Sequence, residues 1–151
     1  SGPAFAHKAF IKEKVVAGAI PGEITANDYV DVPAVCFSDP EIAVVSMTQT
    51  QAKDKDIDVS TSKFPFAGNA RAVSLDEADG FVRLIFTKDD KTIVGGEIVG
   101  PGASDLVAEL SLAVNSHMNV EDIALTIHPH PTLSEPVQEA ADVGLGFPTH
   151  I

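Results

Sequence analysis

Two kinds of hydrophobic periodicity follow one another along this chain, and their order restricts its fold more than any other feature. Between residues 32 and 100, short runs rich in branched and aromatic residues alternate with turn residues, which is typical of β-strands. From residue 104 onward, apolar residues recur at helical spacing. Strands followed by helices, without strict βαβ alternation, predict an α+β fold with helices packed on an antiparallel sheet.

About five strands are expected. The strand signal is carried by "VPAVCF", "IAVVSM", "DVSTSKFPF", "FVRLIFT" and "TIVGGEIVG". Turn chemistry in "SDPE" joins the first two runs as an antiparallel pair, and Asp89 and Asp90 mark the turn of a second hairpin. Between the hairpins, "TQTQAKDK" predicts a short helix opened by Thr48.

Helices are expected at both ends of the chain. Residues 4–20 predict an amphipathic helix, and residues 23–31 form a polar joint between it and the sheet. The apolar stripe of this helix would contain Phe5, Ala9, Val15, Val16 and Ala19. Of three later helices, Ser104 caps the first, Asn119 caps the second, and the third follows "HPHP" and ends at Gly144 as a left-handed cap.

Composition limits the possible partners. The chain has 151 residues, 44% of them apolar, which suffices for one domain with a sizeable core. Its 22 acidic against 10 basic side chains argue against nucleic acid or an anionic membrane, since both require a positive field. No apolar run reaches the roughly 18 residues of a membrane span, so a soluble protein is expected. The single cysteine, Cys36, excludes an internal disulfide framework, and its apolar neighbours predict a buried, inert thiol in a reducing compartment.

A glycine-rich stretch, "GGEIVGPGASD", lies where a phosphate-binding loop would lie, between a strand and a helix. Asp105 occupies the third glycine position of a dinucleotide fingerprint and would place negative charge at the phosphate. Pro101 follows Gly100, so the lysine of a Walker loop is missing as well. The stretch therefore predicts an ordinary strand-to-helix turn.

The segment "HPHPTLSE", residues 128–135, is the main candidate for chemistry. Its prolines forbid regular helix, so His128 and His130 lie on extended chain and could bind one metal ion, but no third ligand stands at a recognised spacing. Alternatively, Glu135 bonds to His130 and holds it as a general base. Thr132 and Glu135 also spell a helix capping box, and residue types alone do not decide between these two roles for the glutamate.

Several segments together resemble a known family. "GPAFAHKA", "VPAVCFSDPEIAVVSMTQTQAK", "GGEIVGPGASDLVAELSLAV" and "HPHPTLSE" are similar, in order and separation, to the C-terminal part of the dihydrolipoamide dehydrogenases, which are flavin-linked pyridine nucleotide-disulfide oxidoreductases. The resemblance covers essentially the whole chain. The glutathione reductases resemble "HPTSSEE" instead at the last segment. Residues 46–48 read "SMT" where relatives resemble "GLT", which leaves the local turn geometry open.

The resemblance implies a division of the chain. Residues 1–22 would be the C-terminal helix of an FAD-binding domain, residues 23–31 a linker, and residues 32–151 a dimerisation domain. A homodimer is also expected because apolar residues on the helix over 104–118 and around 137–147 exceed the needs of one small core.

The resemblance also implies roles for site residues. His130 matches the catalytic histidine and Glu135 the glutamate bonded to it, both acting at the FAD of the partner subunit. His130 would take a proton from a dihydrolipoamide thiol, the thiolate would attack a redox-active disulfide, and electrons would pass through FAD to NAD. The His130-Pro131 bond would be cis, with the His130 carbonyl directed at the flavin. Ala4, Phe5, Ala6 and His7 match positions whose backbone amides meet the flavin.

The chain has neither an intact G-x-G-x-x-G nor a second cysteine, so we expect it to be a fragment that is inactive alone and binds flavin weakly or not at all. The expected partner of the full-length enzyme is the dihydrolipoyl group of a 2-oxo acid dehydrogenase or glycine cleavage complex, in the cytoplasm or the mitochondrial matrix. The alternatives are the same domain of a glutathione reductase-like enzyme, or a free-standing dimerisation module. A metal-binding domain remains a third class, and no metal ligand is assigned.

Overall fold

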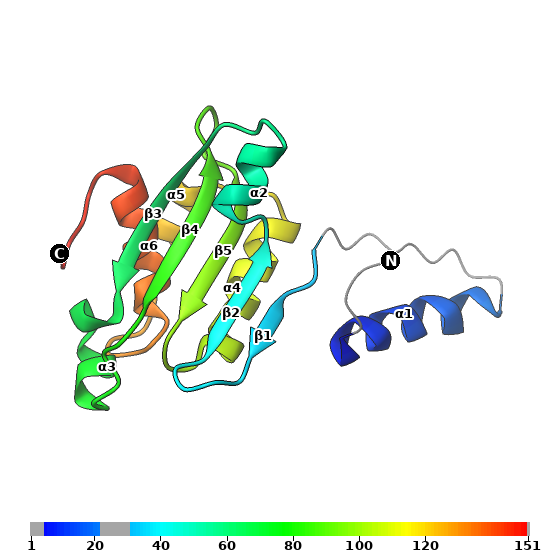
Figure 1. Cartoon of the computed structure of the whole chain (residues 1–151), viewed down its shortest axis with the longest axis horizontal. Helices are drawn as coiled ribbons and strands as arrows, with labels where there is room; N and C mark the ends of the chain where they lie inside the picture. The colour runs from blue at the N-terminus through cyan, green and yellow to red at the C-terminus, as the bar shows by residue number, and fades with distance from the viewer. Residues whose placement is uncertain (1–4, 22–30, 151) are drawn as a thin grey trace.

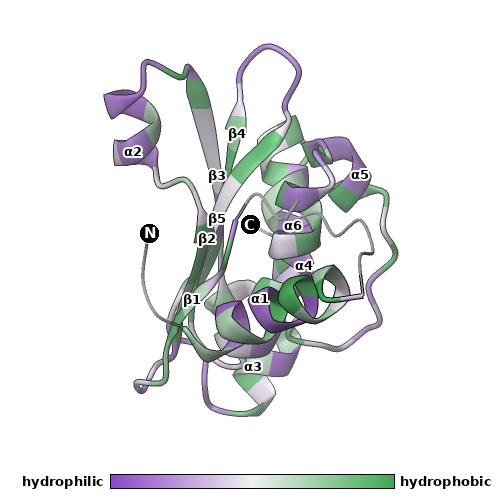
Figure 2. Ribbon diagram, turned by 90° about the vertical axis from the view of Figure 1, so that its right-hand side faces the viewer, coloured by the Kyte–Doolittle hydropathy of each residue, from purple (hydrophilic) through white to green (hydrophobic). Residues whose placement is uncertain are grey.

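A computed structural model describes residues 5–21 and 31–150, and it shows a five-stranded sheet with the last three helices packed on one face (Figures 1 and 2). The strands are β1 (Ala34–Cys36), β2 (Ile42–Ser46), β3 (Val59–Pro65), β4 (Phe81–Thr87) and β5 (Ile93–Val99). The helices are α1 (Ala6–Ala19), α2 (Gln49–Asp54), α3 (Ala70–Ser74), α4 (Ala103–Asn115), α5 (Val120–Ala124) and α6 (Glu135–Leu145), with a 3-10 turn, η1, at Phe66–Gly68. The predicted α+β fold is confirmed.

The sheet has the order β1-β2-β5-β4-β3, and every neighbouring pair is antiparallel. Both predicted hairpins are present, β1 with β2 and β4 with β5. Alternation along β4 turns Val82 and Leu84 into the core, while Arg83 points to the opposite face and pairs with Glu97 of β5 at 2.5 Å. The alternation that predicted these strands therefore also decides which face the helices cover.

Helices α4 and α6 divide that face between them. The first packs on β2 and β5, and the second packs on β3 and β4 and also against α5. Leu110 of α4 is fully buried, and a Cβ at Gly96 of β5 would lie 2.5 Å from its Cδ1 atom. Glycine at position 96 thus lets α4 approach the sheet closely. The core lies between sheet and helices, where Figure 2 shows both layers edge-on.

The start of α4 differs from the prediction. Its N-cap is Gly102, with φ of 67°, and not Ser104, which lies inside the first turn. The backbone amide of Ser104 donates instead to the carboxylate of Glu41, at 2.9 Å. A carboxylate from the β1–β2 connection thus occupies the amide-rich end of the helix, where a phosphate would have to bind. The prediction of an ordinary strand-to-helix turn agrees with this arrangement.

Two other predicted caps are confirmed. Thr48 and Asn119 each accept from a backbone amide of the following helix, in capping boxes completed by Gln51 and Asp122. The predicted end of α6 at Gly144 is wrong by two residues, because the left-handed residue is Gly146, with φ of 86°. The spacing of apolar residues along the helix does not show which of two glycines, two positions apart, ends it.

Two predictions of burial are wrong. Helix α1 forms as expected, but within the described residues it buries none of its side chains, and Val16 of the expected stripe is 61% exposed. Figure 1 shows α1 set apart beyond the β1 edge of the sheet. Cys36 is exposed. Val35 packs against the core, and because side chains alternate along a strand, the next residue, Cys36, points to the opposite face.

Two local features complete the fold. The sequence did not predict η1 or α3, and α3 is opened by Asn69, whose side chain accepts from the Ala72 amide at 2.9 Å. Ser46, the first residue of "SMT", has φ of 57°, in the left-handed region where glycine is favoured. Among the described residues, no helix is both long and apolar enough to cross a bilayer.

Candidate active site

The candidate site lies on the connection between α5 and α6. Pro129 and Pro131 keep this segment out of helical conformation, as expected, and the His130-Pro131 peptide bond is cis. Asn69, at the start of α3, is 4% exposed and donates from Nδ2 to the carbonyl of Thr132 at 3.0 Å. The connection is therefore tied to a second, distant part of the fold.

His130 and Glu135 form a hydrogen-bonded pair. Nδ1 of His130 lies 2.8 Å from Oε1 of Glu135, and 72% of the histidine side chain is exposed. A carboxylate can only accept, so Nδ1 carries the proton of this hydrogen bond. In the neutral ring the lone pair is then on Nε2, which makes Nε2 the basic atom.

Glu135 also has a role at the start of α6. Its second oxygen, Oε2, accepts from the Thr132 amide at 2.7 Å, as the glutamate of a capping box would. The other half of the box is missing, because the Thr132 hydroxyl donates to the Pro129 carbonyl at 2.7 Å and the helix begins only at Glu135. The sequence left two roles open for Glu135, and its carboxylate fills both. Oε1 is hydrogen-bonded to His130, and Oε2 accepts at the start of the helix.

These contacts fix the charge of Glu135. Partial burial alone would raise the pKa of its carboxyl, but the Thr132 amide and His130 outweigh burial. Together with a smaller contribution from His150, they hold the pKa of Glu135 below its ordinary value. A charged carboxylate is what a histidine base requires from the group that orients it.

His128, two residues away, is arranged differently. Its side chain is 5% exposed, Nδ1 lies 2.9 Å from the Thr126 carbonyl, and Nε2 lies 2.9 Å from Oε1 of Glu109 on α4. A carbonyl and a carboxylate are both acceptors, so each ring nitrogen of His128 faces an acceptor. With both nitrogens engaged and the ring nearly closed to water, His128 is placed for a structural role.

No metal site accompanies the two histidines. Over residues 5–21 and 31–150, no group of three or more His, Cys, Asp or Glu side chains is placed to hold a metal ion. Zinc requires three or four ligands from the protein, so the hydrogen-bonded pairs account better for these residues.

The residues predicted to meet flavin lie at the start of α1, except that Ala4 falls outside the described residues. The first helical hydrogen bond runs from the Ala9 amide to the Phe5 carbonyl, at 3.1 Å, and no side chain caps the helix. The amides of Ala6 and His7 therefore have no partner within the helix. Amides without a partner in the helix, at the positive end of its dipole, are compatible with the electron-rich edge of a flavin.

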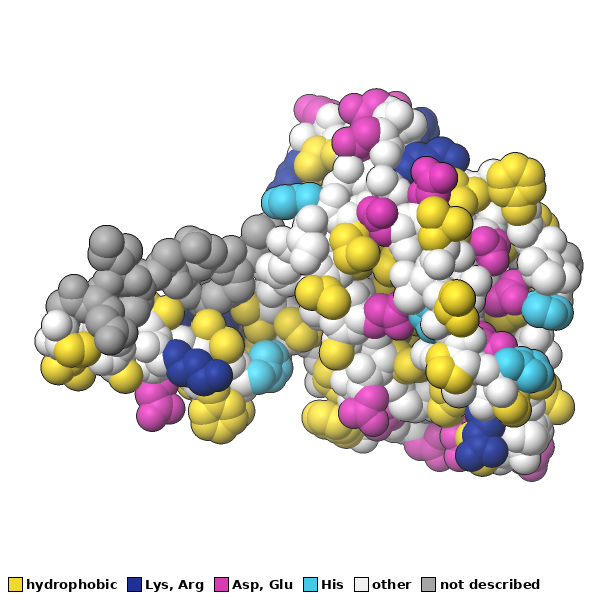
Figure 3. Space-filling view, turned by 180° about the vertical axis from the view of Figure 1, so that it is seen from behind, with side chains coloured by type: hydrophobic (Ala, Val, Ile, Leu, Met, Phe, Trp, Pro, Cys, Tyr) yellow, Lys and Arg dark blue, Asp and Glu magenta, His cyan; other side chains and the backbone are white. Residues whose placement is uncertain are grey.

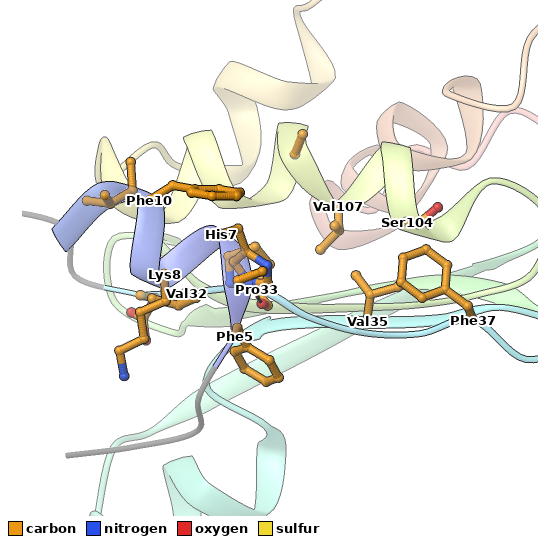
Figure 4. Close-up of a pocket in the computed structure, with 14 residues that line it drawn as sticks. Phe5, His7, Lys8, Phe10, Val32, Pro33, Val35, Phe37, Ser104 and Val107 are labelled. Atoms are coloured by element: carbon orange, nitrogen blue, oxygen red, sulfur yellow. Dashed lines mark hydrogen bonds between the residues drawn. The ribbon is translucent and has the colours of Figure 1, made fainter. Parts of the chain in front are cut away.

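The same helix end borders an open, apolar groove of about 770 Å³ (Figure 4). The His7 ring stacks on Phe5, with centroids 5.2 Å apart, and its Nε2 lies 2.9 Å from the Pro33 carbonyl. Val35 and Phe37, from β1 and the residue after it, line the opposite side. Since the His7 ring is occupied in this way, its backbone is the part left to meet a ligand.

A group of residues that the sequence did not indicate completes the site. A small cavity of about 50 Å³ beside the His130–Glu135 pair is lined by Phe64, Gly68, Asn69, Ala70, His130, Glu135, Glu139 and His150. Glu139 and His150 form a second histidine–carboxylate pair there. One feature of the sequence does point to Glu139: it follows Glu135 by four residues, so the two side chains lie on the same face of a helix.

Comparison with known proteins agrees with this fold. Residues 32–141 match the dimerisation domain of the pyridine nucleotide-disulphide oxidoreductases, and the chain belongs to this family. The dihydrolipoyl dehydrogenase of Geobacillus stearothermophilus is 57% identical over 150 residues, which are 99% of this chain and 32% of that protein. The chain thus spans about a third of the relative's length.

Solved structures show the same likeness. LpdA from Mycobacterium tuberculosis has a TM-score of 0.84 and 28% identity, over 93% of this chain and 31% of that one. The HOCl-induced flavoprotein disulfide reductase RclA from Escherichia coli has a TM-score of 0.86 at 19% identity, over 94% of this chain and 33% of that one. The second comparison shows the fold alone.

Proposed function

We propose that this chain is the C-terminal dimerisation domain of a full-length, FAD-dependent dihydrolipoamide dehydrogenase, and that it supplies the acid–base pair of the reaction. The observation that carries this proposal is the pairing of His130 with Glu135 through Nδ1, which leaves an exposed Nε2 as the basic atom. The naming of a 57% identical relative as dihydrolipoyl dehydrogenase supports the choice of substrate.

In this proposal His130 moves a single proton. Nε2 takes the proton of a dihydrolipoamide thiol, and the resulting thiolate is the effective nucleophile toward a disulfide outside this chain. The Glu135 carboxylate stabilises the imidazolium that forms and keeps the ring in the correct tautomer. The proton leaves from the same Nε2 when the ring returns to its neutral form.

The chain would hold only part of the cofactor site. Flavin, when bound, supplies the two-electron chemistry between disulfide and NAD. From this chain, the amides of Ala6 and His7 would meet the flavin of the same subunit, together with Ala4 and Phe5, while His130 and Pro131 would approach the flavin of the partner subunit. We propose that the isolated chain is inactive and retains neither FAD nor NAD, because one helix end and one loop cannot hold a dinucleotide.

The domain division belongs to the same proposal. Residues 1–22 would be the last helix of the FAD-binding domain, 23–31 a linker and 32–151 the dimerisation domain. Two observations support it: α1 buries no side chain within the described residues, and the family match begins at residue 32. Residues 22–30 themselves lie outside the described residues.

The dimerisation surface would be a homodimer interface on the helical side. Leu112, Leu125 and Ile127 are 63%, 74% and 92% exposed there. Figure 3 shows apolar side chains spread over this face between acidic ones.

The dihydrolipoyl group of a 2-oxo acid dehydrogenase or glycine cleavage complex would be the substrate, in the cytoplasm or mitochondrial matrix.

The decisive experiment replaces the base in the full-length enzyme. With His130→Gln, dihydrolipoamide-dependent NAD reduction should fall by about 10²- to 10⁴-fold, the usual contribution of a positioned general base. The matched control is His117→Asn, because His117 is an exposed histidine with φ of 52°, a conformation that asparagine accepts. Turnover within twofold of native for His130→Gln would remove His130 from the mechanism.

A further inference from the structure

Two histidine–carboxylate pairs line one cavity, although the reaction as proposed uses only one of them. His130 and Glu135 form the first pair, and His150 and Glu139 the second. Glu135 and Glu139 lie one helical turn apart on α6, so both carboxylates are directed to the same side of the helix. The second pair is therefore close enough to affect the charge of the first.

Glu139 is a buried charge with few partners. The residue is 9% exposed, and its Oε1 is bonded to Nδ1 of His150. Its Oε2 is fully buried and has no hydrogen-bond partner among the residues that the structure describes. An ionised carboxylate in such surroundings requires a nearby cation, and His150 is the residue whose protonated ring would supply it among the described residues.

The charge of Glu139 reaches its neighbours on α6. Burial, and then the Glu139 carboxylate, raise the pKa of Asp142, which lies three residues further along the helix. In the other direction His150 contributes to lowering the pKa of Glu135, after burial and the nearer contacts with Thr132 and His130. The second pair and the first are thus electrostatically connected.

We propose that His150 is a positioning residue for the acid–base pair, and that by neutralising Glu139 it keeps His130 able to accept a proton. This inference rests on the proposed function, since it assigns His150 a part in the same proton transfer. Without the His150 charge, Glu139 would place an unbalanced negative charge beside His130 and Glu135. Negative charge favours the imidazolium form of His130, which is unable to act as a base.

Few other charges of the described residues face the cavity. Helix α6 brings Glu135 and Glu139 to its lining, the connection before it brings His130, and the segment after it brings His150. Asp142 lies on α6 outside the lining. Strand β3 turns Ser62 and Phe64 toward the helices, and neither side chain ionises at neutral pH. Asn69 and Ala70, from the start of α3, are likewise uncharged. Helix α5 carries Glu121 and Asp122 in its first turn, outside the lining of the cavity.

The test uses three variants of the full-length enzyme: His150→Gln, Glu139→Gln and the double variant. For His150→Gln, the acid limb of the pH–rate profile should move to higher pH by roughly half a unit, which is the size expected of one partly screened charge. For Glu139→Gln the limb should move to lower pH. In the double variant the limb should return toward its native position, because both charges are gone.

A second readout does not depend on turnover. Carbethoxylation modifies only unprotonated imidazole, so peptide mass spectrometry at a series of pH values reports the protonation of His130 directly. The midpoint for His130 should move as the acid limb does, and His117→Asn should leave it unchanged. If native enzyme does not oxidise dihydrolipoamide, the proposed function fails while this measurement still tests the inference.

Two results would overturn the inference. One is a pH–rate profile for His150→Gln whose acid limb coincides with that of native enzyme. The other is equal loss of turnover at every pH, with an unchanged carbethoxylation midpoint for His130, since a merely structural contact of the last residues would produce that pattern.

Discussion

His128 and His130 lie two residues apart, and each is hydrogen-bonded to a glutamate, but the surroundings of the two rings differ. His128 is 5% exposed and has an acceptor at each nitrogen, whereas His130 is 72% exposed and is bonded at Nδ1. The first ring faces an acceptor through each nitrogen, while the second can exchange a proton at Nε2. The number of acceptors around each ring, and not the presence of a carboxylate, distinguishes a structural histidine from a base.

The two pairs also differ in what they connect. Glu109 and His128 join α4 to the segment before α6, over nineteen residues of sequence. Glu135 and His130 lie within that segment and the first turn of α6. We therefore expect the first pair to hold the segment in place and the second to perform the chemistry, so the equivalent substitution in each should have different consequences.

The largest effect after removal of His130 itself is expected for Glu135→Gln. The neutral amide does not stabilise an imidazolium and can present its own N–H to Nδ1, which favours the tautomer with its proton on Nε2. Turnover of dihydrolipoamide by the full-length enzyme should fall by about 10²-fold. Steady-state kinetics measures this, and a fall in thermal stability with unchanged kcat would reverse the roles assigned to the two pairs.

The corresponding change in the buried pair, Glu109→Gln, should act mainly on stability. It removes the carboxylate that lies 2.9 Å from Nε2 of His128, in a site where the histidine side chain is nearly closed to water. We expect a loss of about 1–2 kcal/mol in the free energy of unfolding, less than for a fully buried pair because Glu109 is partly exposed. Chemical unfolding and turnover should be measured together, with Glu121→Gln, at an exposed position of α5, as the matched control. A loss of turnover equal to that of Glu135→Gln would contradict the comparison.

The two pairs also show which contacts can be predicted from the sequence. The partnership of His130 and Glu135 could be proposed because the two residues are five apart and a proline fixes the conformation between them. Glu109 and His128 are nineteen residues apart and meet only when α4 has docked on the sheet. For the same reason Ser104 looked like a cap, although Glu41, sixty-three residues away, supplies the carboxylate.

Burial was harder to predict than secondary structure. The five strands follow from local periodicity, which the sequence contains in full. The helix over residues 6–19 forms as predicted, although its apolar residues are spread around the helix and make no stripe. Whether α1 buries an apolar stripe depends on what lies beside it, and none of its side chains is buried by the described residues of this chain. Cys36 shows the same limit, because its apolar neighbours do not reveal on which face of an edge strand it points.

The smallest predicted effect concerns a carboxylate far from the site. Asp90 is fully exposed, but the Thr87 hydroxyl, and then the Thr92 amide and hydroxyl, lower its pKa from 3.8 to about 2. Because the folded-state pKa lies below the unfolded one, the stability it contributes is present above pH 3.8 and is lost as pH falls through about 2. Asp90→Asn should therefore lower the melting temperature slightly at pH 7, by an amount that vanishes toward pH 2.

Thermal unfolding at several pH values measures this effect, with Asp89→Asn in the same turn as the control. A difference from native that stays constant down to pH 2 would show that the carboxylate charge is not involved. Unlike Glu135, Asp90 has no histidine partner, so removing it should leave turnover unchanged at every pH at which the enzyme is folded.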